Sequence, residues 1–525
     1  MTKNALISVY HKDGITEFAK ELTDLGWKIY ASGGTAKHLS SAGILVEDVA
    51  TLVGGGAILG HRVVTLSREI HAGLLSRDIS EDIKELADLG IPRLDLVCVD
   101  LYPLETEIAK PDSTRESVVN QTDIGGPTMI RSAVKGGRIV ICDPKDRMSV
   151  IEYLKKGETE SDFVEKLGAK GEYVISKYTL ASAKYLSGGV YDGITGREIA
   201  KCKYGENGYQ TPSALFGSDT KDPLGLDQFE IVEGTPPSYN NYCDIDRLLQ
   251  SMTHIAAAFA VNRKKTPFIA VGGKHGNCCG AAIGDDVKEV VEKMLAGDPL
   301  SIFGGLIMTN FPIDEVLGDT LSGRMLDGVI APDFTPEAIS KLRRKGDKCR
   351  FIKNPSLVSL NESTLDTTPR FRYVRGGFLK QPNYTFIPSL ESEIMQKHLP
   401  ADTSTEDDML LAWAIGSTSN SNTITIVKGG QLLGNGVGQQ DRVGAAKLAI
   451  ERAVRSKHDT NGAAAYSDSF FPFPDGPQTL IDAGIHAIFS TSGSVRDNET
   501  IDLCKSKNVS LYMIPDSSGR GFFGH

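Results

Sequence analysis

The sequence predicts an α/β protein whose strands end in glycine-rich turns. Near the start of the chain, apolar runs alternate with amphipathic segments, which is typical of parallel strands joined by helices. Glycine supplies 55 of the 525 residues, whereas an average protein contains about 7% glycine. These glycines gather where apolar runs end, so the backbone at strand ends can come close to a ligand.

Length and composition limit the kind of protein this can be. A chain of 525 residues is too long for one hydrophobic core; its length allows about three domains of ordinary size, and we expect two to four globular units. The formal net charge of -10 argues against a nucleic-acid partner. The eight cysteines are too scattered for a disulfide framework, and no stretch has the roughly 20 apolar residues of a membrane span. We therefore expect a cytoplasmic protein with reduced thiols and no membrane partner.

The first third of the chain is predicted to be a parallel sheet with helices between its strands. Residues 5–9 and 28–31 have the pattern of buried strands, and residues 15–25 and 33–39 have the pattern of helices. The Ser-Gly-Gly-Thr sequence at 32–35 stands where a strand meets a helix N-terminus, whose free N–H groups suit a phosphate. A tight left-handed turn explains the two glycines equally well.

A second candidate anion site follows in the same third. A strand over residues 94–99 ends at Asp100, and residues 123–135 place an Asp, a Gly pair and Pro127 at the start of a helix. Two such loops at one sheet edge define a candidate pocket. The rest of this unit consists of a strand over residues 138–142, a helix over 163–186 and a glycine-rich junction over 187–196.

Lys274 and His275 stand side by side at the end of an apolar run in the centre of the chain. The run begins at residue 268 and breaks into glycines, so both side chains are expected at the rim of a strand. Lysine and histidine are the side chains whose pKa values can be brought near neutrality, lysine by desolvation and histidine without help. The pair is therefore able to relay a proton, although a solvated turn also explains the dipeptide.

Other turns in the last two thirds carry polar side chains. Asn240 and Asn241 precede a helix near Arg247, and they either cap that helix or bind a ligand. A hairpin is predicted over residues 423–433. The sequence lacks the spacings of common metal sites and the G-x-S-x-G elbow, so neither metal nor Ser-His-Asp chemistry is favoured. Further turns follow apolar runs at residues 203–207, 298–305, 326–332, 438–442, 467–475 and 493–497.

Many of these motifs occur together, in order, in one known family. They are Ser8-Val-Tyr-His-Lys12, Ser32-Gly-Gly-Thr-Ala-Lys37, Leu101-Tyr-Pro103, Asp123-Ile-Gly-Gly-Pro127, Tyr204-Gly-Glu-Asn207, Lys274-His275, Phe303-Gly-Gly305, Arg375-Gly-Gly-Phe378, Ser421-Asn422, Gly438-Gln-Gln440 with Arg442, Ser467-Asp468, Phe470-Phe-Pro-Phe473 and Asp475. Through these motifs nearly the whole chain resembles the bifunctional purine-biosynthesis enzymes that combine aminoimidazole carboxamide ribonucleotide (AICAR) transformylase with inosine monophosphate (IMP) cyclohydrolase.

The resemblance implies a fold and a pair of reactions. Residues 1–197 would form a doubly wound, methylglyoxal-synthase-like domain, and residues 198–525 a transformylase domain of two cytidine-deaminase-like α/β/α halves. AICAR would take a formyl group from the cosubstrate 10-formyltetrahydrofolate, and formyl-AICAR would then close to IMP with loss of water. The family implies a homodimer with transformylase sites at the subunit interface. No metal is required, and binding of a monovalent cation is left open.

The resemblance also implies roles for residues in formyl transfer. The amine of AICAR is a poor nucleophile, so transfer needs a base for its proton and an acid for the departing folate nitrogen. By resemblance His275 takes the proton, Lys274 assists its transfer, and Asn422 orients the formyl group and stabilises the oxyanion. Asp475 would be a further catalytic residue that contacts folate together with Phe473. The matching nucleotide and substrate contacts are Lys203, Tyr204, Asn241, Phe303, Gly304, Asp327 and Arg442.

Ring closure is unimolecular, so positioning and polarisation of the reacting groups can suffice. By resemblance Tyr102, Asp123 and Lys135 are the catalytic residues of this second site. The matching substrate contacts are Ser8, Lys12, Ser32, Gly33, Gly34, Thr35, Arg62 and Thr65.

Several positions depart from the family pattern. Val64 stands where the family has a lysine in the cyclohydrolase site, and Ser67 and Arg68 follow in place of His and Pro. Lys203 replaces an arginine, which keeps the charge but gives up bidentate geometry. Cys278 replaces a proline.

The missing lysine leaves a second hypothesis open. In it the chain is a transformylase only, and residues 1–197 are a non-catalytic nucleotide-binding or regulatory module. A third hypothesis is a ligand-binding protein that lacks both activities. The presence of Lys274, His275, Asn422 and Asp475 argues against that third hypothesis.

Overall fold

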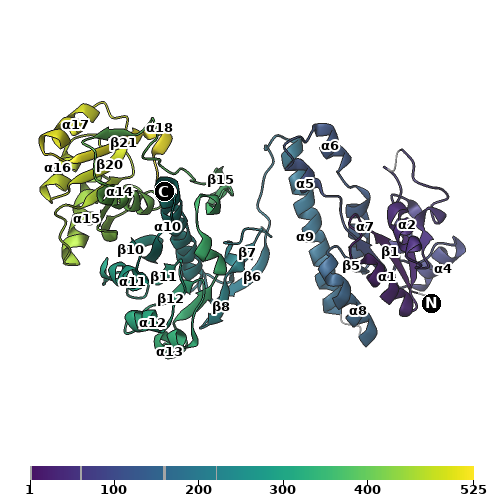
Figure 1. Ribbon diagram of the computed structural model, residues 1–525. Coiled ribbons are helices and arrows are strands. Elements are labelled where there is room, and N and C mark those ends of the chain that lie inside the picture. The colour runs from purple at the N-terminus through teal and green to yellow at the C-terminus, as the bar shows by residue number, and fades with distance from the viewer. Residues whose placement is uncertain (1–2, 60–61, 158–160, 220, 525) are drawn as a thin grey trace. The chain divides into compact units, whose positions relative to one another are not determined.

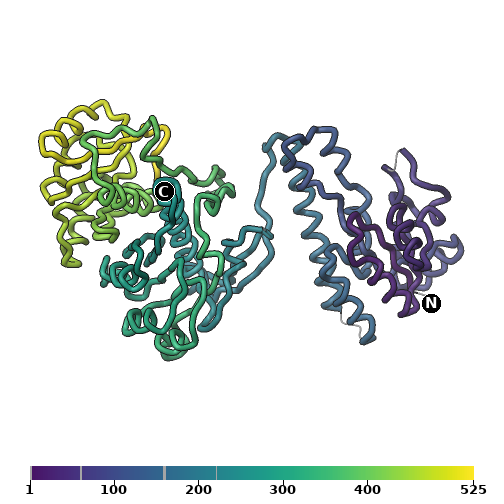
Figure 2. The backbone as a smooth tube through the Cα atoms, viewed as in Figure 1, coloured from purple at the N-terminus to yellow at the C-terminus, as the bar shows by residue number. Residues whose placement is uncertain are grey.

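The computed structural model describes residues 3–59, 62–157, 161–219 and 221–524. The chain divides into two compact units, Met1–Thr195 and Gly196–His525. The first unit runs from purple to blue in Figures 1 and 2, and the second from blue-green to yellow. The boundary after residue 197 that the motifs suggest stays a prediction. No helix among the described residues is long and apolar enough to cross a membrane.

A five-stranded parallel sheet forms the centre of the first unit, as the alternation of strands and helices predicts. Its strand order is β3-β2-β1-β4-β5. The chain builds the sheet outward from β1 on one side and then on the other, so the carboxyl ends of β1 and β4 form a topological switch point, where ligands usually bind. The strands are β1 (Asn4–Ser8), β2 (Lys28–Ala31), β3 (Glu47–Asp48), β4 (Leu96–Val99) and β5 (Ile139–Ile141).

Helices cover both faces of this sheet, which confirms the doubly wound architecture. In β1, Ala5 and Ile7 pack into one apolar cluster, and Leu6 packs into another on the opposite face. This alternation follows from the two-residue period of a strand. The first cluster is completed by α1 (Ile15–Asp24), α2 (Gly33–Ser41) and α8 (Arg147–Lys156), and the second by α3 (Arg68–Leu75) and α7 (Gly125–Lys135). The long helix α9 (Ser161–Leu186) contributes side chains to both clusters. The remaining helices are α4 (Ser80–Asp88), α5 (Leu104–Ile108) and α6 (Arg115–Asn120).

A twelve-stranded mixed sheet runs through the second unit, in the order β16-β21-β20-β19-β17-β18-β10-β9-β11-β12-β13-β8. Strands β10 and β18 join its two ends. The strands of one end are β8 (Glu230–Glu233), β9 (Phe268–Lys274), β10 (Asn277–Gly284), β11 (Leu306–Thr309), β12 (Gly328–Ala331) and β13 (Arg350–Lys353). Those of the other are β16 (Gln396–His398), β17 (Ile424–Lys428), β18 (Gln431–Gly436), β19 (Ala464–Ser467), β20 (Ala487–Ser492) and β21 (Ser510–Pro515).

The two ends of this sheet repeat one order of elements. In each half the chain begins with a short strand, a helix then leads into an antiparallel hairpin, and three parallel strands follow. The first, short strand pairs antiparallel with the last of the three and forms the edge of the sheet. The leading helices are α10 (Tyr239–Arg263) and α14 (Thr403–Gly416), which pack together in the largest apolar cluster. Two further clusters lie under α11 (Val287–Ala296), α12 (Glu315–Leu321) and α13 (Pro336–Leu342), and under α15 (Arg442–Arg455), α16 (Asp475–Asp482) and α17 (Asp497–Ser506). The cytidine-deaminase likeness of the halves stays a prediction.

The apolar run that begins at Phe268 is a hairpin, and its glycines lie further inside the strand than the sequence suggests. Gly272 and Gly273 belong to β9, and the turn comes only after Lys274. A Cβ on Gly272 would lie 2.5 Å from Ile302, so this glycine allows close packing and does not mark the turn.

The hairpin predicted over residues 423–433 is confirmed as β17 and β18. Two small antiparallel pairs stand apart, β6 (Arg197–Cys202) with β7 (Ser213–Gly217) and β14 (Arg370–Val374) with β15 (Gly377–Gln381), and α18 (Asp516–Gly519) follows β21.

Candidate active sites

Lys274 and His275 begin the tight turn between β9 and β10. Lys274 pairs with Asn277 across the hairpin, so His275 and Gly276 are the two loop residues. Their φ angles are 55° and 71°, the left-handed pair that a type I′ turn requires. Histidine is uncommon in this conformation, which costs a residue other than glycine about 1–2 kcal/mol. The turn presents the His275 side chain to solvent.

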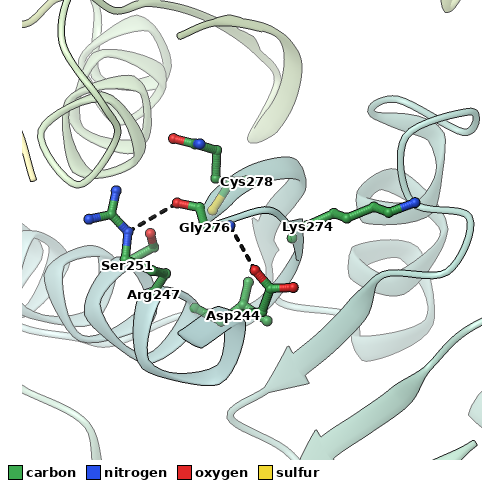
Figure 3. A pocket seen from close by; sticks show the side chains of 9 residues that line it. Asp244, Arg247, Ser251, Lys274, Gly276 and Cys278 are labelled. Carbon is green, nitrogen blue, oxygen red and sulfur yellow. Dashed lines mark hydrogen bonds between the residues drawn. The ribbon is translucent and has the colours of Figure 1, made fainter. Parts of the chain in front are cut away.

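Helix α10 holds this turn with two side chains from its first turns. The carboxylate of Asp244 accepts the Gly276 N–H at 2.7 Å, and Nε of Arg247 donates to the Gly276 carbonyl at 3.0 Å. Both bonds are drawn in Figure 3. Burial raises the pKa of Asp244, and the N–H groups of Gly276 and His275 oppose that rise. Burial also lowers the pKa of Arg247 to about 10. The turn is thus fixed at both the N–H and the carbonyl of Gly276.

The Lys274 side chain extends away from Asp244 and Arg247, as Figure 3 shows. Its Nζ donates to the Phe303 carbonyl at 2.8 Å. Gly304 follows with a φ of 70°, and a Cβ there would lie 3.6 Å from the Lys274 ammonium. The N–H of Asp327 bonds to Gly305, so Asp327 reaches the same sheet edge. The structure therefore brings Lys274, Phe303, Gly304 and Asp327 together.

The segment containing Asn422 lies against the Lys274–Asn277 hairpin. The Asn420 N–H donates to the side-chain oxygen of Asn277 at 3.2 Å. Two residues further on, the N–H and the side-chain amide of Asn422 donate to the Gln439 carbonyl at 3.0 and 2.9 Å. His275 and Asn422 are thus each two residues from the same polar contact, although the residues are far apart in the sequence.

Arg442 begins α15 and makes a buried ion pair. Its Nη1 lies 2.6 Å from Oδ1 of Asp468, and its Nε donates to the Phe470 carbonyl at 2.8 Å. Both charged side chains are almost fully covered, so the arginine is rigidly held. Phe473 is exposed, and the guanidinium of Arg496 lies 4.8 Å from the centre of its ring.

Asp475 is the first residue of α16 and is exposed. Its carboxylate accepts the Gly476 N–H at 2.8 Å.

Lys203 and Tyr204 lie in the loop between β6 and β7, next to the start of α10. The side-chain amide of Asn240 donates to the Glu206 carbonyl at 3.3 Å and ties this loop to the helix. Asn241 forms a capping box with Ser238, since its side-chain oxygen accepts the Ser238 N–H at 3.0 Å. Of the two roles that the sequence leaves open for Asn241, the structure shows the capping role.

The phosphate candidate of the first unit lies at the switch point of the sheet. The hydroxyl groups of Ser8 and Ser32 are hydrogen-bonded at 2.8 Å, and Thr35 bonds to the Val9 backbone at 3.2 Å. Helix α2 starts at Gly33, whose φ is 26°. In the described part of the chain, the N–H groups of Gly33 and Gly34 donate no hydrogen bond, so they are free to bind an anion.

Lys12 adds a positive charge close to this helix start. Its ammonium donates to the carbonyl groups of Val9 and Tyr10. Burial lowers the pKa of Lys12, and the nearby Asp100 partly opposes this. Asp100 in turn accepts the His11 N–H at 2.9 Å. The loops after β1 and β4 therefore meet, as the parallel topology requires.

Tyr102 and Asp123 lie together beside the start of α7. Burial raises the pKa of Asp123, while the N–H of Gly126 bonds to its carboxylate at 2.8 Å. Burial and the nearby Asp123 carboxylate also raise the pKa of Tyr102. The Asp123 N–H donates to the Tyr178 hydroxyl at 2.6 Å, so α9 helps to hold this loop.

Thr65 reaches this second cluster, and Lys135 lies at the far end of α7. A Cβ on Gly125 would lie 2.6 Å from the Thr65 hydroxyl, so Thr65 packs on the first residue of α7. Lys135 ends that helix of 11 residues, and a rise of about 1.5 Å per residue puts it roughly 15 Å from Gly125. Val64 is half-buried in the apolar cluster under α7 and supplies no charge. Arg62 is exposed and donates to the Asn120 side chain at 3.0 Å.

The motifs do not identify several residues that position these groups. Asp244, Arg247 and Tyr178 each act across a contact that no local pattern predicts. One sequence signal exists for Asp244: it is the sixth residue of α10, as Asp408 is the sixth of α14. Only the repeated order of elements makes that correspondence visible.

Fold and geometry define a protein of two α/β units, each with polar side chains gathered at strand ends where small anionic ligands are bound in enzymes of this class. A family profile described as an MGS-like domain matches residues 14–128, and one described as the AICARFT/IMPCHase bienzyme matches residues 137–452. The chain belongs to the AICARFT/IMPCHase bienzyme family.

Relatives with curated names match almost the whole chain. The bifunctional purine biosynthesis protein PurH of Bacillus cytotoxicus is 35% identical over 97% of this chain and 98% of its own length. PurH of Aquifex aeolicus is 34% identical over the same shares, and PurH of Rhodopirellula baltica is 34% identical over 100% of this chain and 99% of its own. A solved structure, the crystal structure of ForH, is 32% identical over 35% of this chain and all of its own, with a TM-score of 0.32.

Proposed function

We propose that this chain is a bifunctional enzyme of the last two steps of purine biosynthesis, formyl transfer to AICAR and closure of formyl-AICAR to IMP. The observation that carries the proposal is the match to bifunctional purine biosynthesis proteins over 97% of the chain. The matched region includes both units of the chain, so one activity is assigned to each unit. The transformylase-only hypothesis is not favoured, because relatives that are named as bifunctional proteins match 97% of this chain and 98% of their own length.

Formyl transfer is assigned to the surroundings of the β9–β10 turn. His275 stands exposed at the tip of the turn and is the proposed base for the amine proton. Lys274, with one donor used on Phe303, retains hydrogens to pass to the folate nitrogen. Asn422 has one amide bond to Gln439, and its proposed role is to orient the formyl group and stabilise the oxyanion.

The same proposal assigns binding residues to this reaction. Arg442, fixed by Asp468, is a cation that can hold the nucleotide together with Lys203 and Tyr204. Asn241 supports that site through the helix cap. The remaining proposed contacts are Phe303, Gly304 and Asp327 for substrate, and Phe473 and Asp475 for 10-formyltetrahydrofolate.

Ring closure is assigned to the switch point of the first unit. Ser8, Ser32 and Thr35, with the free N–H groups of Gly33 and Gly34, form the proposed phosphate site. The half-buried Asp123 carboxylate and the neighbouring Tyr102 hydroxyl would polarise the reacting groups, since partial desolvation strengthens electrostatic interactions there. The further proposed residues are Lys12, Arg62, Thr65 and, from the far end of α7, Lys135.

The assembly and location remain proposals as well. The family resemblance supports a homodimer with transformylase sites at the interface between copies. All eight cysteines are free, which fits the proposed cytoplasmic location because thiols stay reduced there.

One assay tests both activities at once. Purified protein is given AICAR and 10-formyltetrahydrofolate, and formyl-AICAR and IMP are quantified separately against a protein-free control. We expect IMP to form faster than in the control. Accumulation of formyl-AICAR with no faster closure would show that the first unit is not a cyclohydrolase, and absence of folate turnover would overturn the transformylase assignment.

A further inference from the structure

Arg247 joins two segments that carry proposed catalytic residues. Its Nε donates to the carbonyl of Gly276, the residue after His275, at 3.0 Å. Its Nη2 donates to the side-chain oxygen of Asn420 at 3.1 Å, and Asn420 is two residues before Asn422. One planar guanidinium therefore fixes the distance between the turn and the Asn422 segment.

The ring of Phe523 packs against the same guanidinium. Phe523 is 3% exposed, and its N–H donates to the Ser419 carbonyl at 2.9 Å. The Arg247 guanidinium lies 4.3 Å from the centre of the ring, and that of Arg370 lies 3.4 Å from it. Cation–π attraction of this kind strengthens when the groups are desolvated. Gly524 leaves the room that this requires, since a Cβ there would lie 3.1 Å from Nη1 of Arg247.

The second half of the unit has the same hairpin without this arginine. Asp408 of α14 accepts the N–H groups of Gly429 and Gly430 at 2.8 and 2.7 Å, as Asp244 does for the first turn. When the two aspartates are aligned, Arg247 corresponds to Leu411, which is fully buried in the core. The hairpin therefore folds without an arginine, and folding alone does not account for Arg247.

We propose that Arg247, held by Phe523, is a positioning residue for formyl transfer that sets the spacing between His275 and Asn422. It acts through Gly276 and Asn420 and does not itself touch the reacting atoms. The inference rests on the proposed transformylase function and adds two residues to it.

Three variants and a control test the proposal in the full-length protein. Arg247→Leu introduces the residue of the other half, Arg247→Lys keeps the charge without the planar fork, and Phe523→Leu keeps an apolar side chain without the ring. The control is Arg263→Lys, because Arg263 also joins α10 to a second segment through Glu406 and Asp407. At about 1.5 Å per residue it lies roughly 24 Å further along α10.

The readouts are kcat and KM for formyl transfer, closure of supplied formyl-AICAR, and the melting temperature. We expect Arg247→Leu to lower the kcat of formyl transfer about tenfold to a hundredfold, as small misplacements do. The rate of formyl-AICAR closure and the KM values for AICAR and 10-formyltetrahydrofolate should stay within about twofold of wild type, because a positioning group acts on the chemical step. Arg247→Lys and Phe523→Leu should give smaller losses of kcat, and Arg263→Lys none.

The proposal is overturned if Arg247→Leu keeps kcat within about twofold of wild type, or if Arg263→Lys lowers kcat equally. A lower melting temperature with unchanged kcat shows a structural role only and also overturns it. A wild-type protein that transfers no formyl group instead contradicts the proposed function, and that failure is visible before any variant is made.

Discussion

The hairpins β9–β10 and β17–β18 occupy the same place in the two halves of the second unit and differ at their turns. In the second hairpin the loop residues are Gly429 and Gly430, with φ angles of 58° and 70°. The first has His275 and Gly276 at nearly the same angles. Glycine adopts this conformation without strain, and histidine does so at a cost of about 1–2 kcal/mol. Stability alone therefore favours glycine at position 275, so we attribute His275 to function.

The features that both hairpins share are those that fold the turn. Asp244 and Asp408 come from the leading helix of their own half, and each accepts backbone N–H groups of its turn. The features of only one hairpin are His275 and Arg247. The two aspartates thus fold their turns, whereas His275 and Arg247 are the groups proposed to act in catalysis.

The largest effect is expected at His275. His275→Gly should lower formyl transfer by about 10²–10⁴-fold, the usual contribution of a general base. The same change should leave stability equal or raise it by up to about 1–2 kcal/mol, because the left-handed strain is removed. Rates are measured with AICAR and 10-formyltetrahydrofolate, and stability by urea unfolding. His275→Ala, which keeps the strain, is the matched variant, and near-normal turnover in either would refute the assigned role.

The next effect is expected from the paired aspartates. Asp244→Ala and Asp408→Ala should each destabilise the second unit by about 1–3 kcal/mol, because the turn N–H groups lose their side-chain acceptor. Only Asp244→Ala should also slow formyl transfer, since Asp244 alone holds the turn that carries His275. Thermal unfolding and turnover of both variants are compared. Equal loss of activity in the two would show that the halves do not differ as we infer.

A smaller effect is expected when histidine is placed in the second hairpin. Gly429→His should cost about 1–2 kcal/mol of stability, because the residue keeps a left-handed φ. Formyl transfer should be unchanged. The free energy of unfolding is measured by urea titration, with Lys428→Ala at the preceding, ordinary strand position as the control. If Gly429→His lowered the free energy of unfolding by less than Lys428→Ala does, the turn would tolerate a side chain at position 429 without strain.

The smallest effect is a pH dependence of stability at Asp408. Burial raises its pKa, so the folded chain binds this proton more tightly than the unfolded chain. The stability that protonation contributes is present below the ordinary aspartate pKa and is lost as pH rises through the raised value. The difference in unfolding free energy between wild type and Asp408→Asn should therefore fall with rising pH, by at most about 1.4 kcal/mol per pH unit. Urea unfolding from about pH 4 to about pH 7 tests this, and a difference that rises with pH would contradict it.

Patterns within a few residues predict much of the fold. The parallel sheet of the first unit, the hairpin at residues 423–433 and the helix start at Gly33 follow from strand and helix periodicity and from glycine. Local pattern does less well where packing decides. Gly272 resembles a turn residue but lies inside β9, because its neighbour Ile302 leaves no room for a side chain. For Asn241, by contrast, local pattern already allows a helix cap, which the structure shows, and the assignment of Asn241 to the nucleotide stays a prediction.

The sequence by itself determined the order of strands and helices and the family, since periodicity and short motifs are local properties of the chain. Only the tertiary structure decided which side chains meet. Arg247 and Asn420 are 173 positions apart, and Asp244 and Gly276 are 32 apart, so no short pattern relates them. The physical reason is that a sheet brings strand ends together through backbone pairing, and the contacts made there depend on the packing of helices from both halves.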